Sequence, residues 1–360
     1  MSGQAQSRRV ESKTNALGLE KVATFPRMRV LAWAGEDLYA SRGYEVFSMR
    51  PNESLAWRSI GNFQPSAWRR LTSSVPLASR VFRDGFHALC VHPSGSLIGA
   101  VPGAIVTCPS GENTFHVTHV IQRGTRPLHV TASLNGRVYW GEYFDNAERS
   151  EVHIYCSSDS GLSWNVAYTF SAKAIRHIHN IVFDRWQNCL WILTGDYGHE
   201  CRVLQASIDL KNVEPVLEGN QQARAVAFVP TPEGSYFASD TPLEKNSIYR
   251  MGSEEVPTIV ASLNHSSIYG CAVQNALFFT TMVEPSTVNT SREVHLYGSL
   301  DGEQWQKCCA WKKDVLPMAL FQYGNCFLPD GENQTHFLAA STIAVEGASE
   351  LILWRVLGIH

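Results

Sequence analysis

Short hydrophobic segments alternate with turn-forming residues along most of this chain. Segments such as 29–33, 136–140 and 189–193 are apolar or alternate between apolar and polar positions, and Gly, Pro, Asn and Asp separate them. Runs of this length between such residues are typical of β-strands. No stretch of about 12 residues shows a convincing helical period. The segment 64–84, rich in Ser, Arg and Pro, is the best candidate for helical or irregular structure.

A pair of apolar strands with a turn between them recurs about every 46 residues, a period typical of β-propeller blades. The pairs begin near Val30, Ala88, Val130, Val182, Val226, Cys271 and Leu320. In addition, residues 151–159 recur as 293–301, an offset of 142 residues. We therefore expect an all-β protein, a β-propeller of seven four-stranded antiparallel blades, although six or eight blades would also fit the weakly marked fourth strands.

The repeat predicts a single domain. We expect residues 1–25 to be a leader or tail and residues 26–360 to form one propeller, with an insertion near 64–84. Stacking the blades in a ring buries faces that a lone sheet would expose and protects most strand edges.

Composition excludes several other classes of protein. Hydrophobic residues make up 44% and charged residues 18% of the chain, whereas an average domain has roughly 25% charged residues. This balance excludes a disordered chain, a coiled coil and a long-helix bundle. A net charge of −3 recruits neither nucleic acid nor an anionic membrane. No secretory signal or bilayer-spanning run is visible, and nine scattered cysteines fit reduced thiols, so we expect a cytoplasmic protein.

Residues 157–164 read Ser-Ser-Asp-Ser-Gly-Leu-Ser-Trp, which fits the Asp-box Ser-x-Asp-x-Gly-x-x-Trp. Residues 299–305 fit it with one residue fewer between Asp and Gly. The chain thus resembles the BNR/Asp-box, sialidase-like β-propellers. The resemblance implies structural turns at the outer rim, in which Asp and Ser bind turn backbone, Gly takes a positive φ and Trp packs between blades.

The resemblance does not extend to sialidases proper. Their Arg-Ile-Pro motif is missing, and only Arg176 and Arg224 match their three carboxylate-binding arginines. Seven-bladed propellers also include polysaccharide lyases, which pair His and Tyr as base and acid and in some cases neutralise a uronate with a metal or Arg. The polar residues below resemble those sites in kind.

In a propeller, residues that enter inner strands and leave second strands meet at one mouth of the central channel. The predicted catalytic residues are His129, His177, His179, Glu142, Asp196 and Tyr269. The predicted substrate-binding residues are His87, Arg176, Tyr143, Tyr197, His199, Arg224 and Asp240.

His177 and His179 lie on one face of their predicted strand. They could bind a metal, or one could act as base while the other orients substrate; equally, both could be structural. A metal would need a third ligand, for which His199 and His129 are candidates. We expect no required cofactor, with a divalent metal as an option.

These residues favour an enzyme, namely a glycoside hydrolase or polysaccharide lyase that acts on a neutral or acidic glycan by His, Tyr and carboxylate acid–base chemistry. One alternative is a non-catalytic propeller that binds a glycan or a protein. Another is an intracellular glycan-assembling enzyme, a glycosyltransferase or phosphorylase of polysaccharide biosynthesis. The expected partner is an oligosaccharide or polysaccharide, with no nucleic acid and no membrane. The oligomeric state is left open.

Overall fold

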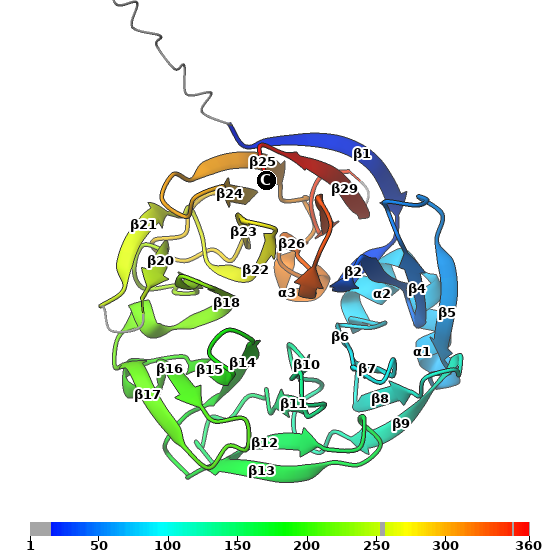
Figure 1. Cartoon of the computed structure of the whole chain (residues 1–360), viewed down its shortest axis with the longest axis horizontal. Helices are drawn as coiled ribbons and strands as arrows, with labels where there is room; N and C mark the ends of the chain where they lie inside the picture. The colour runs from blue at the N-terminus through cyan, green and yellow to red at the C-terminus, as the bar shows by residue number, and fades with distance from the viewer. Residues whose placement is uncertain (1–15, 253–255, 348, 360) are drawn as a thin grey trace, which may run out of the picture.

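The computed structural model describes residues 16–252, 256–347 and 349–359. Its strands form a closed ring of mainly antiparallel sheets around a central axis (Figure 1). Five sheets have four strands each, and a nine-stranded sheet contains two further four-stranded runs and β27. The described strands thus group into seven four-stranded units. The predicted all-β propeller fold is confirmed.

Six units follow the chain, each running from an inner strand to an outer one. The first two comprise β2 (Arg29–Gly35), β3 (Asp37–Arg42), β4 (Glu45–Met49) and β5 (Arg58–Phe63), then β6 (Ala88–Val91), β7 (Leu97–Val101), β8 (Ala104–Cys108) and β9 (Thr114–Val120). The next two comprise β10 (Thr131–Ala132), β11 (Val138–Gly141), β12 (Val152–Ser157) and β13 (Asn165–Phe170), then β14 (His177–Asp184), β15 (Cys189–Gly195), β16 (Arg202–Ala206) and β17 (Val213–Glu218). The last two comprise β18 (Ala225–Thr231), β19 (Gly234–Ser239), β20 (Ser247–Met251) and β21 (Thr258–Ser262), then β22 (Ser267–Val273), β23 (Ala276–Thr281), β24 (Glu293–Ser299) and β25 (Gln306–Lys312).

The two ends of the chain close the ring together. The closing unit combines β1 (Gly18–Pro26) with β29 (Glu350–Leu357), β28 (Phe337–Ile343) and β26 (Asn325–Phe327). Gly18 lies opposite Leu357 and Pro26 opposite Glu350, so the first strand completes the last sheet. Residues 18–25, expected in a leader, therefore belong to the propeller. Of that predicted leader, residues 1–15 lie outside the described residues.

One predicted strand pair is wrong in phase. Leu320, expected to start the last pair, lies in the short helix α3 (Met318–Phe321). The inner strand of the closing unit is instead β26, and its second strand is β28, while β27 (Asp330–Asn333) pairs parallel with β2. An apolar helical turn and a three-residue inner strand obscure the repeat here.

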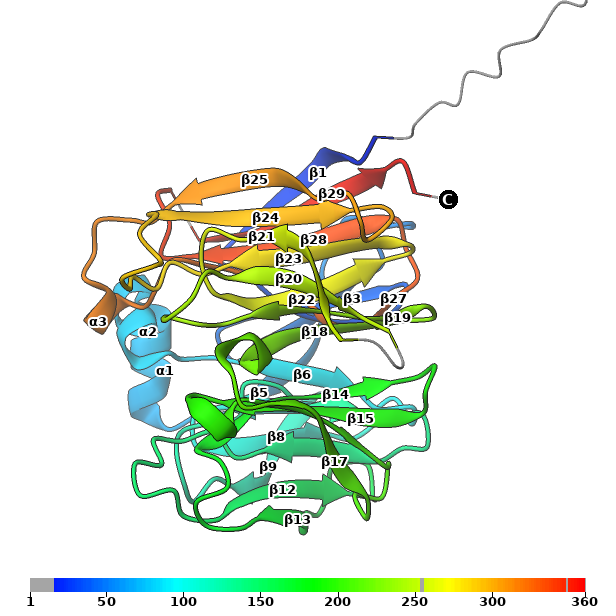
Figure 2. The same cartoon turned by 90° about the vertical axis from the view of Figure 1, so that its left-hand side faces the viewer.

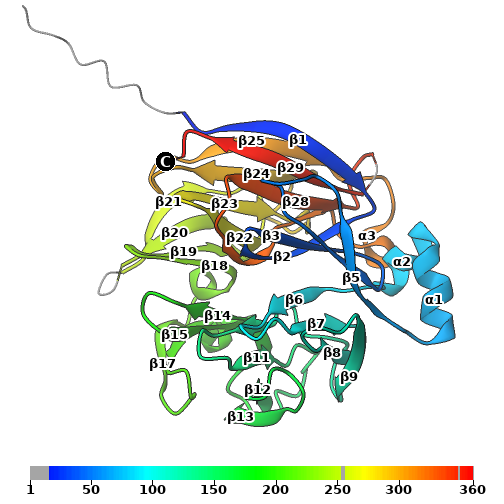
Figure 3. The same cartoon turned by 45° about the vertical axis from the view of Figure 1, so that its right-hand side comes forward.

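Residues 64–84 include two short helices, α1 (Ala67–Ser74) and α2 (Pro76–Phe82). Asp84 fixes them by accepting a hydrogen bond from Thr72 at 2.6 Å and pairing with Arg69 at 2.9 Å. Both helices and α3 lie in connections from an outer strand to the next inner strand. They therefore share the face of the ring on which the inner strands begin, which we call the entry face (Figures 2 and 3).

The core lies between neighbouring units. One cluster, for example, packs Tyr139 and Ile154 of the third unit against Ile178, Leu190 and Ile192 of the fourth. Burying such a side chain contributes roughly 1.5–3 kcal/mol, which gives each unit a reason to stack on the next. Two 3-10 turns, η1 (Gly198–Glu200) and η2 (Gln221–Ala223), complete the secondary structure of the described residues. None of the described helices has the length and apolarity needed to cross a membrane.

The two Asp-box segments form closely similar turns. Ser157 donates to Asp159 at 2.7 Å, and Ser299 donates to Asp301 at 3.0 Å. Trp164 packs beside Trp140, and the second-box Trp305 packs near Tyr236 and Phe279 of two adjacent units. The local geometry is the one expected of rim turns, while membership of the Asp-box family remains a resemblance.

Candidate functional site

A β-bulge aims the two histidines of β14. His177 lies opposite Gly195 and Ile178 opposite Thr194, but Asn180 lies opposite Leu193, so His179 is the extra residue. Bulges bend a strand and redirect side chains.

The same irregularity recurs in the inner strands β2, β18 and β22. The extra residues there are Leu31, Val226 and Ile268. Among these four bulges, only the one in β14 carries a titratable side chain.

His177, His179 and Asp196 meet in a compact, buried group, which we call the central triad. The Nε2 atoms of the two histidines lie 3.2 Å apart. Oδ1 of Asp196 lies 3.3 Å from Nε2 of His179 and 3.6 Å from Nε2 of His177. A Cβ atom at Gly195 would lie 2.7 Å from Cε1 of His179, so a glycine is needed before Asp196.

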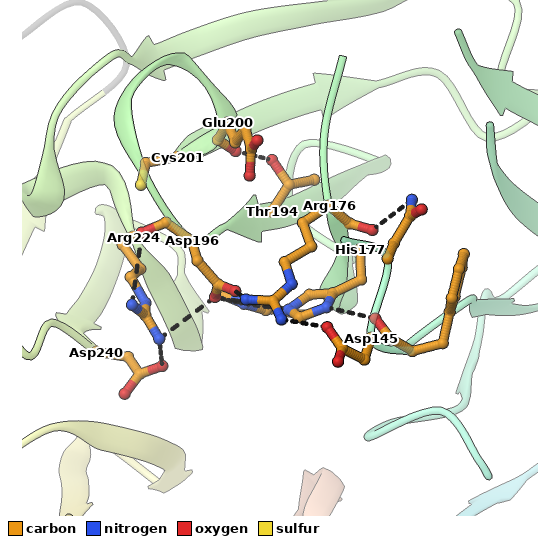
Figure 4. Close-up of polar contacts among 12 residues, drawn as sticks. Asp145, Arg176, His177, Thr194, Asp196, Glu200, Cys201, Arg224 and Asp240 are labelled. Atoms are coloured by element: carbon orange, nitrogen blue, oxygen red, sulfur yellow. Dashed lines mark hydrogen bonds and ion pairs between the residues drawn. The ribbon is translucent and has the colours of Figure 1, made fainter. Parts of the chain in front are cut away.

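Two arginines hold Asp196 from either side (Figure 4). Arg176 lies 2.8 Å from Oδ2 and also pairs with Asp145, while Arg224 lies 3.3 Å from Oδ1. Burial opposes ionisation of Asp196, but hydrogen bonds and charges from the triad histidines outweigh it. The pKa of Asp196 is therefore well below its usual range, and the group is ionised.

The pKa of Asp240 is shifted in the opposite direction to that of Asp196. Arg224 lies 3.5 Å from its Oδ2, whereas its Oδ1 is buried without a hydrogen-bond partner. Burial raises the pKa of Asp240 to about 6, despite the nearby Arg224. Burial also raises the pKa of Tyr143 to about 12, aided by the charges of Asp240 and Asp196. The Tyr143 ring centroid lies 4.4 Å from that of His177, so an ionised carboxylate, a neutral phenol and imidazoles are gathered here.

Acidic residues follow the second strand in four consecutive units. They are Glu142, Asp196, Asp240 and Glu284. Glu142 is diverted from the others: it pairs with Arg123 and accepts the backbone N–H of His153 at 2.8 Å. Glu142, predicted to be catalytic, is therefore held by these contacts rather than joined to Asp196. Glu284, which was not among the predicted site residues, does belong to this group, since its charge acts on Arg224 and Asp240.

His129 and Tyr269 form a second group rather than joining the triad. Nδ1 of His129 lies 2.9 Å from Asp330, and its ring centroid lies 6.0 Å from that of Tyr269. Tyr269 also interacts with Arg29, which lies over the Phe327 ring at 3.8 Å. The predicted catalytic residues are thus divided between two clusters.

Three predicted binding residues lie apart from the triad. The ring of His87 approaches the carbonyl oxygen of Arg83 at 2.6 Å, and burial holds its pKa well below the usual range. His199 lies on η1 near the carbonyl oxygen of Lys173. Asp196, rather than His199, is therefore the third potential metal ligand beside His177 and His179. Tyr197 is half-exposed, with Arg224 5.9 Å from its ring centroid.

A basic cavity of about 720 Å³ opens beside α1 and α2. Six arginines contribute to its wall, namely Arg27, Arg29, Arg42, Arg70, Arg80 and Arg83. Arg80 pairs with Asp314 at 2.7 Å, whereas Arg29 and Arg83 have no carboxylate within ion-pair distance among the described residues. Nearby, burial and the positive charges of Arg29 and Arg83 lower the pKa of Arg126 to about 10.

These arginines were missed in the sequence. Arg29 does start an inner strand at the repeat position near that of Arg224, which is a usable signal, but Arg83 and Arg126 lie in irregular connections.

Comparison with known proteins supports the fold alone. No protein-family model matches the chain, and no curated protein matches its sequence. Among solved structures, it is similar to a catalytically inactive histidine-to-alanine variant of virginiamycin B lyase from Staphylococcus aureus with quinupristin (TM-score 0.57, 11% identity, covering 94% of this chain and 98% of that one). It is also similar to the WD40 β-propeller domain of Doa1 (TM-score 0.56, 10% identity, 94% and 97% coverage). An ancestral GH74 enzyme gives a TM-score of 0.54 at 10% identity, covering 92% of this chain and 46% of that one. The chain is therefore a β-propeller whose neighbours include both enzymes and a WD40 domain.

Proposed function

We propose that the protein is a carbohydrate-active enzyme that cleaves an acidic oligosaccharide or polysaccharide at the centre of the entry face. One observation carries this proposal: Tyr143 of the acid–base cluster interacts electrostatically with Arg126, and neither Arg126 nor its neighbours Arg29 and Arg83 has a carboxylate partner within ion-pair distance among the described residues. Burial, and after it the positive charges of Arg29 and Arg83, lower the pKa of Arg126, so positive charge is concentrated here. An acidic sugar would supply the missing negative charge, because guanidinium groups bind carboxylates in a bidentate geometry.

We favour β-elimination, the lyase reaction, over hydrolysis. A base removes the proton from the carbon beside the uronate carboxylate, a C=C bond forms, and the C–O bond to the leaving sugar breaks. The leaving oxygen takes a proton, so no co-reactant is consumed. Asp240, with a pKa of about 6, is ionised near neutral pH and suits the base. Tyr143, with a pKa of about 12, keeps its proton and suits the acid, while the arginines would stabilise the charge that develops on the carboxylate.

Hydrolysis is the second candidate, because a pair of carboxyl groups with separated pKa values is the arrangement that glycosidases use. Asp196 and Asp240 form such a pair around Arg224. A glycan-assembling enzyme would instead use the basic cavity to bind a phosphate group. A non-catalytic binder would not need these acid–base residues. The products distinguish these options.

The test incubates the full chain with a panel of uronate-containing and neutral glycans. We expect new reducing ends together with the ultraviolet absorbance of an unsaturated uronate. Asp240→Asn and Tyr143→Phe should each lower kcat by about 10²–10⁴-fold, the usual contribution of general acid–base catalysis. Asp209→Asn, at an exposed turn, and Tyr155→Phe, stacked on Trp140, are matched controls that should retain activity.

Reducing ends without unsaturated product would establish hydrolysis instead. Binding of acidic glycans without turnover would favour the non-catalytic propeller. Turnover that survives both Asp240→Asn and Tyr143→Phe would refute the assigned roles.

A further inference from the structure

We propose that Nε2 of His177, Nε2 of His179 and Oδ1 of Asp196 bind a divalent transition-metal ion, with Zn²⁺ preferred, and leave a fourth coordination position open. The inference does not depend on which reaction the protein catalyses. It rests on the tautomers that the surrounding backbone imposes on the two histidines, on the spacing of the three atoms, and on the charge of the surrounding groups.

Both histidines must carry a hydrogen on Nδ1. Nδ1 of His177 lies 3.0 Å from the carbonyl oxygen of Phe144, and Nδ1 of His179 lies 3.0 Å from that of Ala225. A carbonyl oxygen only accepts hydrogen bonds, so each Nδ1–H donates to it. In the neutral imidazole, Nε2 then presents a lone pair. Two lone pairs therefore face each other at 3.2 Å, and both face a carboxylate oxygen.

With both imidazoles neutral, the three facing atoms repel one another, so the arrangement needs positive charge between them: either protons on Nε2 that are donated toward Asp196, or a metal ion. A single proton on Nε2 of one imidazole would form a hydrogen bond to only one of the other two atoms. The lone pair of the second imidazole would still face the carboxylate oxygen. A metal ion accepts electrons from all three at once. Backbone carbonyls that fix the tautomer of ligating histidines are also the usual outer partners of a metal site. Arg176 plays the equivalent part for Asp196 by holding Oδ2, while Oδ1, which also lies 3.3 Å from Arg224, faces the histidines.

The spacing fits a tetrahedral ion. With metal–ligand bonds of about 2.05 Å, the ligand atoms of a tetrahedral zinc site lie about 3.3 Å apart. The three separations in the triad are 3.2, 3.3 and 3.6 Å. Two imidazole nitrogens with one carboxylate, plus an open position, form the donor set of a catalytic zinc site. Mg²⁺ and Ca²⁺ prefer oxygen ligands and suit this set poorly.

The ionisable groups around the triad also favour a bound cation. The neighbouring carboxylates are Asp145, Asp196, Asp240 and Glu284, and the neighbouring guanidinium groups are Arg176 and Arg224. Carboxyl groups thus outnumber guanidinium groups around the triad by four to two, an excess that favours a bound cation.

The test uses untagged full-length protein stripped with a chelator and then titrated with ZnCl₂ in a calorimeter. We expect one Zn²⁺ per chain, a rise in the thermal unfolding midpoint on binding, and no competition from excess Mg²⁺. CoCl₂ should give the visible absorption of tetrahedral Co²⁺, which reports coordination in the wild-type protein without any variant. His179→Ala and Asp196→Ala should each weaken binding at least about 100-fold, more than loss of an outer partner costs.

His199→Ala is the matched control, because His199 lies on the same face but outside the triad, and its stoichiometry should stay at one. A wild-type protein that takes up no Zn²⁺ and gives no Co²⁺ spectrum would overturn the inference. So would Zn²⁺ binding that persists unchanged in His179→Ala or is lost in His199→Ala. Because metal uptake is measured without turnover, a failure here is distinct from a failure of the proposed lyase activity.

Discussion

Asp159 at the rim and Asp196 near the ring axis both have carboxyl pKa values below the usual range, although burial opposes the shift in each case. The groups that lower the two values come from different places. Asp159 accepts hydrogen bonds from Ser157, Leu162 and Ser163, all within four residues. Asp196 is held by side chains that arrive from two units of the ring.

The source of these hydrogen bonds separates a structural carboxylate from a functional one. The Asp159 turn satisfies its own carboxylate, so nothing remains to interact with a ligand. At Asp196 the fold brings together imidazoles and guanidinium groups that have no local reason to meet. It also makes the two Nε2 atoms and Oδ1 of Asp196 face one another, and it leaves an Asp240 oxygen without a partner. Unsatisfied groups in a converged cluster are what a bound ion or substrate would complete.

Of the changes considered, Gly195→Ala should have the largest effect on the metal site. It keeps all three proposed ligands but forces the ring of His179 to move. The new Cβ would lie 2.7 Å from Cε1 of His179, which would have to shift. We expect Zn²⁺ affinity to fall by about 100-fold, the upper range for losing a group that positions a ligand, as measured by calorimetry. Gly18→Ala is the control, because its Cβ would make an ordinary 3.4 Å contact with Leu357. Unchanged affinity in Gly195→Ala would show that the triad tolerates displacement and is no tight metal site.

Arg126→Gln tests whether the basic residues near the site bind the acidic group of the substrate. If Arg126 binds the acidic group of the glycan, its loss removes one charge-assisted hydrogen bond, worth about 1.5–3 kcal/mol. We expect KM for a uronate oligomer to rise by at least about 10-fold, while any turnover of a neutral glycan is unchanged. Arg250→Gln, whose exposed side chain pairs with Glu303, should have no effect in the same assay. An equal effect on acidic and neutral glycans would exclude a carboxylate contact.

Much of the fold could be predicted because it is periodic. Six of the seven predicted strand pairs coincide with the first two strands of their units. The gathering of His177, Asp196 and Arg224 also follows from periodicity, because equivalent positions in neighbouring units meet at the same face. The closing unit was out of phase because its inner strand is short and preceded by a helix rather than by a regular connection.

The rest of the site depends on interactions that no periodic pattern encodes. The bulge at His179 is a property of strand pairing, and it decides where that imidazole points. Glu142 follows its strand as Asp196 does, but Arg123 from the preceding connection captures it. His199 was expected as a ligand, yet the turn η1 directs its ring toward Lys173. Arg83 and Arg126 gain their importance only from their neighbours in space, since neither belongs to a strand.

Asp159→Asn should have the smallest effect of the three changes, because Asp159 only stabilises its own turn. Because the folded-state pKa of Asp159 is lowered, its stabilising contribution is present above its ordinary pKa, near 3.8, and is lost as pH falls toward the folded value. Replacing the carboxylate weakens charge-assisted hydrogen bonds at an exposed turn, so we expect a loss of about 1 kcal/mol in the free energy of unfolding at neutral pH. Urea titrations at neutral pH and near pH 2 should show the difference shrinking at low pH. Zn²⁺ affinity and turnover should match the wild type, because the rim turn shares no contact with the triad; a change in either would mean that the two aspartates are coupled through the ring.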